Sequence, residues 1–141
     1  MLEDRSRLRE QLVKHEGYRQ YAYRDTVGKL TIGYGRNLDD VGVSRLEAEF
    51  LLEQDIDKAI LGLVQGYDWF ERLSSVRQAV LVNMAFNLGG AGLAQFRNTL
   101  AMMASGDYDG AANGMLNSKW AGQVKGRATE LARMMRSGAW V

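Results

Sequence analysis

The sequence has 141 residues and a formal net charge of +1, and its hydrophobic (46%) and charged (25%) contents are ordinary for a globular protein. It contains no Cys, which excludes disulfides and thiol catalysis, and its one His leaves too few ligands for a zinc hydrolase. Residues 1–70 carry 10 Lys/Arg and 13 Asp/Glu, whereas residues 71–141 carry 8 and 4. The second half is therefore mildly basic, far below the charge density of a nucleic-acid binder.

The first seventeen residues, MLEDRSRLREQLVKHEG, are charged throughout. They lack the apolar segment of a secretory signal peptide. A membrane span needs about eighteen consecutive apolar residues, and no stretch of the sequence is nearly that long. We therefore expect a protein that is made in the cytoplasm and has no stable association with membranes.

Residues 2–14 are predicted to form a helix, because apolar residues lie one turn apart among charged ones and Gly17 can end it. In residues 18–35, aromatic and β-branched residues flank the turn DTVG. This pattern predicts a small antiparallel hairpin. Residues 36–43, RNLDDVGV, are predicted to be a loop.

The clearest helix signal begins at Ser44, where SRLE forms a capping box with Glu47. The predicted helix continues to Gly66 with one apolar face. That face consists of Ala48, Leu52, Ile56, Ile60 and Leu63.

The segment that begins at Ser74 or Ser75 is apolar nearly all round, which predicts a central buried helix with Gly89 as its end. Four shorter helices are predicted after it. They are LAQFRNTLAMMAS ended by Gly106, a helix through Leu116 capped by Asp107, a piece around Trp120 capped by Ser118, and residues 127–136 with Ala128, Leu131 and Met135 on one side.

This order of elements predicts an α+β fold, with a mostly helical lobe, a small antiparallel β-hairpin lobe and an active-site cleft between them. We expect a single domain over residues 1–141. The small β lobe is predicted at about residues 17–43, and residues 1–16 and 44–141 are predicted to form the helical lobe.

Few kinds of hydrolytic chemistry fit these residues, because no nucleophile elbow and no phosphate-binding loop is present. Two carboxylates remain as the natural machinery of a hydrolase. Glu16 lies at the C-terminal end of a predicted helix, where the helix dipole disfavours the carboxylate and so favours the acid. Asp25 lies in a turn and is expected to stay ionised, and Thr31 could direct its hydroxyl at a water.

An ordinary structural interpretation remains open at this point. A Glu at the end of a helix and an Asp in a turn are common in proteins without any catalytic function. The Tyr residues of the hairpin are equally compatible with packing and with a platform for sugars. Spacing alone does not separate an active site from a capped turn.

The stretch EG followed by Y-x-D-T-x-G-x-x-T-I-G-x-G resembles the catalytic signature of the T-even phage lysozymes, a family of phage-type muramidases and endolysins. The Glu–nine–Asp–six–Thr spacing fits that signature without gaps. The resemblance continues through NMAFNLG, FRNTL, SKW and GRATELARMMRSGAW, and so extends over nearly the whole chain.

The resemblance implies a lysozyme-like fold and hydrolysis of the β-1,4 bond between N-acetylmuramic acid and N-acetylglucosamine in peptidoglycan. It implies that Glu16 is the general acid, that Asp25 assists the attacking water and that Thr31 helps to hold it. Arg127 matches a basic residue near the catalytic Glu, which would orient or tune it. The implied stereochemistry is inversion, which requires the two carboxyl groups to be about 6.5–9.5 Å apart.

The resemblance also implies saccharide contacts. Phe86 and Asn87 match positions that line the cleft of the family, and Asn37 and Thr99 match further contact positions. One aligned cleft Asn is replaced by Gly114, so a saccharide contact is expected to be lost there.

Three further departures from the family pattern are visible. Only twelve residues lie between Thr31 and Ser44, fewer than in the larger members, which predicts a compact variant with a shortened β lobe and a more open cleft. Arg36 stands where the family often has His. QVKG replaces a turn with Pro before Arg127.

We therefore expect an endolysin that lyses its host cell, acts on bacterial peptidoglycan as a monomer and needs no metal or other cofactor. It would be made in the host cytoplasm and depend on a holin to reach the wall. The alternatives are a lytic transglycosylase that cuts the same bond, a catalytically silent wall-binding module, and a helical protein that binds nucleic acid or a partner. The weak net charge disfavours the last of these.

Overall fold

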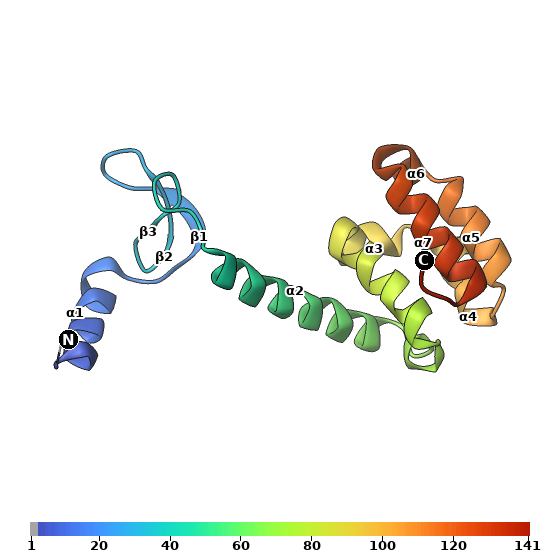
Figure 1. The fold of residues 1–141 in the computed structure, drawn as a ribbon, viewed down its shortest axis with the longest axis horizontal. Coiled ribbons are helices and arrows are strands. Elements are labelled where there is room, and N and C mark those ends of the chain that lie inside the picture. Colours follow the sequence, from blue (N-terminus) through green and yellow to red (C-terminus); the bar gives the residue numbers. More distant parts are fainter. Residues whose placement is uncertain (1–2) are drawn as a thin grey trace. The chain divides into compact units, whose positions relative to one another are not determined.

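The computed structural model describes residues 3–141, which form two compact units divided after Phe50. The chain is 67% helical and carries a three-stranded antiparallel sheet (Figure 1). These proportions confirm the predicted α+β, lysozyme-like class. The predicted single domain and its lobe boundaries stay predictions.

The first unit begins with the helix α1 (Arg5–Glu16). The Gly17 N–H donates to the carbonyl of Val13 at 2.9 Å and ends the helix, as the sequence predicts. The helix runs two residues further than predicted, and residue 2, where the prediction starts, lies outside the described residues. None of its residues is buried.

A sheet of β1 (Arg19–Arg24), β2 (Leu30–Gly33) and β3 (Arg36–Asn37) follows, in the order β1–β2–β3. β1 and β2 form the predicted hairpin. The Gly28 N–H donates to the carbonyl of Asp25 at 3.0 Å and closes the turn.

The prediction that residues 36–43 are all loop is wrong at its start, because β3 pairs with β2. Gly33 and Gly35 have φ values of 68° and 73°, which only Gly adopts readily, and they reverse the chain between the two strands. Thr31 then lies opposite Asn37.

The long helix α2 (Arg45–Gly66) has the predicted capping box. The Glu47 N–H donates to Ser44 Oγ at 3.1 Å, and the Ser44 N–H donates to Glu47 Oε1 at 2.9 Å. Of the predicted apolar face Leu63 alone is buried, while Leu52 and Ile60 remain 45% and 39% exposed.

The second unit continues with a short 3-10 helix, Phe70–Arg72, and α3 (Ser75–Ala94). Ser74 caps α3 by accepting from the Arg77 N–H at 3.3 Å. Gly89, at φ 75° and ψ 164°, interrupts the helix where the sequence predicts its end, but the chain then resumes helical structure to Ala94.

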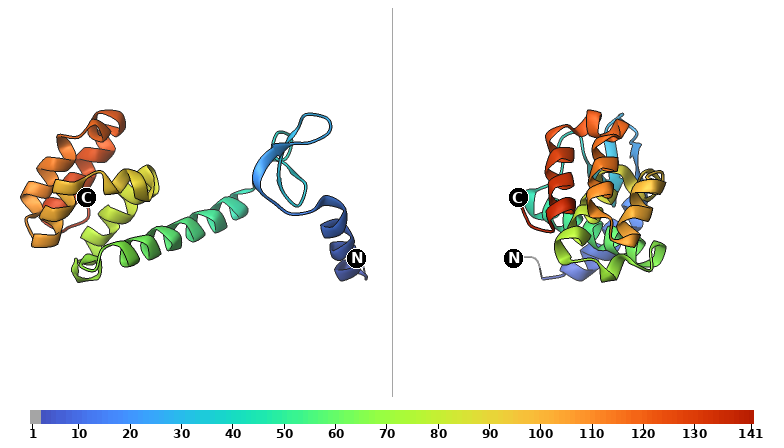
Figure 2. Two further views of the ribbon diagram at one scale, coloured as in Figure 1. Left: turned by 180° about the vertical axis from the view of Figure 1, so that it is seen from behind. Right: turned by 90° about the vertical axis from the view of Figure 1, so that its right-hand side faces the viewer.

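Four helices complete the second unit, and Figures 1 and 2 show them packed side by side. They are α4 (Arg97–Ser105), α5 (Tyr108–Leu116), α6 (Lys119–Val124) and α7 (Gly126–Ser137). α4 starts later than predicted, because Leu93 belongs to α3 and the chain bends at Gln95. The predicted caps Asp107 and Ser118 are confirmed by bonds from the N–H groups of Gly110 and Ala121, at 2.9 and 3.1 Å.

The buried hydrophobic side chains of the described residues all belong to the second unit. Val80, Leu81 and Met84 of α3 are fully buried, but Asn83 and Phe86 are exposed, so the helix predicted to be central and buried is buried along one side only. Ala128, Leu131 and Met135 of α7 are buried as a single face, as predicted. Helix propensity alone stabilises such short helices little, so this shared core holds them.

No single helix within residues 3–141 is long and apolar enough to cross a membrane. α3 and α4 pass that test only as a pair, which is bent by 108°.

Candidate active site

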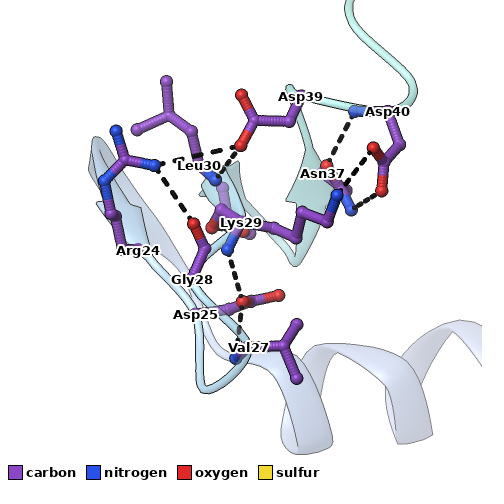
Figure 3. Close-up of polar contacts among 10 residues, drawn as sticks. Arg24, Asp25, Val27, Gly28, Lys29, Leu30, Asn37, Asp39 and Asp40 are labelled. Carbon is purple, nitrogen blue, oxygen red and sulfur yellow. Dashed lines mark hydrogen bonds and ion pairs between the residues drawn. The ribbon is translucent and has the colours of Figure 1, made fainter.

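Asp25 lies in the turn between β1 and β2, and its carboxylate is held by the backbone of that turn (Figure 3). Oδ1 accepts from the Val27 N–H at 3.0 Å and from the Lys29 N–H at 2.8 Å. Both bonds go to one oxygen, which leaves Oδ2 available for a water or a substrate. Hydrogen bonds from backbone N–H groups to a carboxylate are charge-assisted and fix its orientation.

Thr31 lies in β2, opposite Tyr23 on one side and Asn37 on the other. It is 3% exposed, and its hydroxyl donates to the carbonyl of Lys29 at 2.9 Å. The hydroxyl proton is thus already used, and the oxygen lone pairs remain for accepting a hydrogen bond. A water near Thr31 would be held as a donor to this oxygen.

Ion pairs tie the loop after β3 to the hairpin (Figure 3). Asp39 accepts from the Leu30 N–H at 2.8 Å, and the Lys29 ammonium donates to Asp40 at 3.1 Å. The hydrogen bond from Lys29 lowers the pKa of Asp40, and the same bond raises the pKa of Lys29. These contacts link the loop after β3 to Lys29 and Leu30, which lie between Asp25 and Thr31 in the chain.

Asn37 uses both ends of its amide in that loop. Its Nδ2 donates to Asp40 Oδ2 at 2.9 Å, and its Oδ1 accepts from the Asp40 N–H at 2.9 Å (Figure 3). Its predicted contact with a saccharide stays a prediction.

Glu16 is the last residue of α1 and is exposed. Its carboxyl group packs against Gly35, in the turn between β2 and β3: a Cβ atom at Gly35 would lie 2.7 Å from Glu16 Cδ. The first unit thus holds all three predicted catalytic residues. The distance between the two carboxyl groups that inversion requires stays a prediction.

In the second unit, Phe86 and Arg127 line a cavity of about 460 Å³ between α2 and α3. Phe86 is 46% exposed. Arg127 donates from Nε to Asn83 Oδ1 at 2.9 Å and from Nη2 to the Asn83 carbonyl at 3.4 Å. The rest of its guanidinium remains available, and the size of the cavity is typical of ligand pockets.

Asn87 and Thr99 are engaged inside the second unit. Asn87 Oδ1 accepts from the indole N–H of Trp120 at 2.7 Å. Thr99 is 6% exposed, and its side chain fills the space beside Gly114, where a Cβ atom would collide with Thr99 Oγ1. The predicted saccharide contacts of both residues stay predictions.

Within residues 3–141, no three His, Cys, Asp or Glu side chains gather in a way that could hold a metal ion.

The family model described as phage lysozyme matches residues 13–136, which include every predicted site residue. The chain belongs to the phage lysozyme family. Among similar proteins is "Pre-baseplate central spike protein Gp5" of Enterobacteria phage T4, 28% identical over 92% of this chain and 27% of its own length. The family was therefore predicted correctly from the sequence.

Two other relatives of the chain differ in length. "Probable T4-type lysozyme 2" of Dictyostelium discoideum is 26% identical over 94% of this chain and 95% of its own length. "Peptidoglycan hydrolase gp36" of Pseudomonas phage phiKMV is 30% identical over 90% of this chain and 15% of its own length. The chain thus spans about a quarter of the T4 spike protein and less of the phiKMV hydrolase, but nearly all of the Dictyostelium protein.

Sequence reasoning missed two residues, one in each unit, that contact predicted site residues. One is Gly35, although the Gly-Tyr-Gly step directly after a predicted strand was a signal of close backbone approach. The other is Asn83, the partner of Arg127. Asn83 and Asn87 are four residues apart on a predicted helix, and two amides on one face of an otherwise apolar helix could have indicated a polar site.

Proposed function

We propose that this chain hydrolyses the β-1,4 bond between N-acetylmuramic acid and N-acetylglucosamine in bacterial peptidoglycan. The observation that carries the proposal is the family match over residues 13–136, which includes Glu16, Asp25 and Thr31 at the spacing of the family signature. Two relatives, one named as a probable T4-type lysozyme and one as a peptidoglycan hydrolase, support the same substrate.

In the proposed mechanism Glu16 donates a proton to the oxygen of the leaving sugar. Asp25, whose Oδ1 is fixed by two backbone N–H groups, uses Oδ2 to accept a proton from the attacking water. Thr31 accepts a second hydrogen bond from that water, because its own proton is held by the Lys29 carbonyl. A water that attacks from the face opposite the leaving group inverts the anomeric carbon.

Arg127 is proposed to orient Glu16, and Asn37, Phe86, Asn87 and Thr99 are proposed to contact saccharides. The chain is proposed to work as a monomeric endolysin, made in the host cytoplasm and released to the wall by a holin. The excess of Lys/Arg in residues 71–141 favours association with an anionic wall. Lysis on expression of this chain without a holin or a permeabilising agent would contradict the dependence on a holin.

The test compares Glu16→Gln with wild type in the clearing of chloroform-permeabilised Gram-negative cells. Removal of a general acid should lower the clearing rate by about 10²–10⁴-fold. Glu10→Gln is the matched control, because Glu10 is an exposed Glu of the same helix and the change is chemically the same. It should clear at the rate of wild type. Equal clearing by wild type and Glu16→Gln would show that Glu16 is not the acid.

The products separate the remaining alternatives. Mass spectrometry should find muropeptides with ordinary reducing ends, heavier by one water than the 1,6-anhydro products of a lytic transglycosylase. Anhydro products would show that the chain is a lytic transglycosylase and not a hydrolase. Binding to sacculi without release of muropeptides by wild type would identify a silent wall-binding module.

A further inference from the structure

The carboxyl group of Glu16 occupies the space that a side chain at position 35 would fill. A Cβ atom at Gly35 would lie 2.7 Å from Glu16 Cδ and 3.1 Å from Glu16 Cγ, and it would collide with Glu16 Oε2. We propose that Gly35 is a positioning residue, whose lack of a side chain determines where the Glu16 carboxyl group lies. The catalytic consequence of this inference rests on the proposed function.

Glu16 needs such a contact because little else in the first unit holds it. The ion pairs of residues 3–50 are Arg24–Asp39, Lys29–Asp40 and Arg36–Glu47, and none of them includes Glu16. Its side chain is exposed and has several rotatable bonds, so it loses considerable rotamer freedom when it is fixed. Within residues 3–50, the contact with Gly35 restricts these rotamers.

Two separate features require a Gly at position 35, and they can be separated experimentally. One is the backbone, because φ is 73° and a side chain there costs strain. The other is the contact with Glu16. Gly33, two residues earlier in the same turn, shares the first feature with φ 68°, but nothing lies within 4 Å of a Cβ atom built there.

Gly33→Ala is therefore the matched control for Gly35→Ala. Both variants should lose thermal stability through backbone strain. Only Gly35→Ala should also displace the Glu16 carboxyl group, and a catalytic group displaced by about 1 Å can cost about 100-fold in rate. On a soluble peptidoglycan oligomer we expect kcat to fall by that factor in Gly35→Ala with KM little changed, and to stay within a few-fold of wild type in Gly33→Ala.

The position of the carboxyl group can also be followed without activity. The ¹³C resonance of the Glu16 carboxyl carbon, assigned by its absence in Glu16→Gln, should shift in Gly35→Ala and stay unchanged in Gly33→Ala. An equal response of this resonance in the two variants would overturn the inference, and so would equal kcat values. If wild type does not hydrolyse peptidoglycan at all, the proposed function fails, and the resonance still decides whether Gly35 positions Glu16.

Glu16→Asp covers the case in which Gly35→Ala does not fold, because it leaves Gly35 in place. It withdraws the carboxyl group by one methylene and removes the contact with Gly35. In ¹³C relaxation the carboxyl group at position 16 should then be more mobile than in wild type, although a shorter side chain ordinarily moves less. Glu10→Asp, an exposed position of the same helix, is the control and should show no gain in mobility. A carboxyl group at position 16 that is no more mobile in Glu16→Asp than in wild type would overturn the inference.

Discussion

Asn87 accepts a hydrogen bond from the indole N–H of Trp120, which is the one polar group of a ring that is 4% exposed. Replacing Asn87 with Ala removes the acceptor of that partly buried bond. We expect a loss of about 0.5–1.5 kcal/mol in the free energy of unfolding, measured by urea denaturation. Asn87→Asp, which keeps an acceptor oxygen, should lose less.

This prediction separates two roles for Asn87. A structural role lowers stability in Asn87→Ala and leaves KM unchanged below the unfolding transition. Wild-type stability together with a raised KM would instead support the saccharide contact that the family resemblance implies.

The residues of the site differ in how far local chemistry could reveal them. The turn of Asp25 could be predicted from DTVG, because its hydrogen bonds join residues at most four apart. The bond between Asn87 and Trp120 spans 33 residues, and the contact between Glu16 and Gly35 needs the sheet to bring them together. Neither leaves a periodic signal in the sequence.

At the scale of elements, the N-terminus of α2 is held by a carboxylate with two partners. Glu47 accepts from Ser44 in the capping box and also forms a bidentate pair with Arg36 of β3, at 2.9 Å from Nη1 and 2.6 Å from Nη2. The hydrogen bonds from Arg36, followed by those from Ser44, lower the pKa of Glu47 from 4.5 to about 2. The capping box was predicted, but its link to the sheet was not.

The link predicts an acid-sensitive contribution to stability. A carboxyl group whose pKa is lower in the folded state stabilises that state above its unfolded pKa, and the contribution is lost as pH falls from 4.5 towards 2. Gln at position 47 keeps the capping bond but not the charge. We expect Tm of Glu47→Gln to lie below that of wild type at pH 7, with a gap that closes towards pH 2.

Arg36→Gln is the control for this titration. It should bring the Glu47 pKa, measured by ¹³C NMR of the carboxyl carbon, back towards 4.5. A Glu47 pKa that is unchanged in Arg36→Gln would show that the ion pair does not form in solution.

Other elements show where sequence reasoning succeeds at this scale. Helices with a side-chain cap start within a residue of their predicted positions, because a cap is a local and specific interaction. They are the helices that begin after Ser44, Ser74, Asp107 and Ser118. β3 was missed because a strand of two residues is too short to show an alternation of apolar and polar side chains. Its pairing with β2 depends on the turn at Gly33 and Gly35. The break at Gly89 was predicted, but the next helix was predicted from Leu93 on, whereas helical structure resumes directly after Gly89 and continues to Ala94.

At the scale of the whole molecule, burial is uneven. The hydrophobic core described in residues 3–141 extends from Leu63 to Met135, and Thr31 is the one buried residue described before it. Helices far apart in sequence close this core, and Arg77 of α3 links it to the end of α7. Arg77 donates to the carbonyls of Met135 and Arg136 at 2.7 and 3.1 Å, and its guanidinium stacks over the ring of Tyr108 at 3.7 Å.

Arg77→Met should therefore destabilise the helical core. Met keeps an unbranched apolar stem but loses both charged hydrogen bonds and the stacking, which together are worth about 2–4 kcal/mol. Urea unfolding followed by tryptophan fluorescence measures the loss. Arg133→Met on the exposed side of α7 is the control and should change stability by less than about 0.5 kcal/mol. Equal losses in the two variants would show that the links made by Arg77 contribute nothing specific.

The contact between Thr99 and Gly114 has a consequence for attempts to strengthen α5. Gly in the interior of a helix ordinarily lowers stability by about 0.5–1 kcal/mol relative to Ala, so Gly→Ala changes usually stabilise a helix. A Cβ atom at position 114 would collide with Thr99 Oγ1, so this gain is not available at Gly114 while the Thr99 side chain keeps its position. A smaller side chain at position 99 would open the space that Ala at position 114 needs.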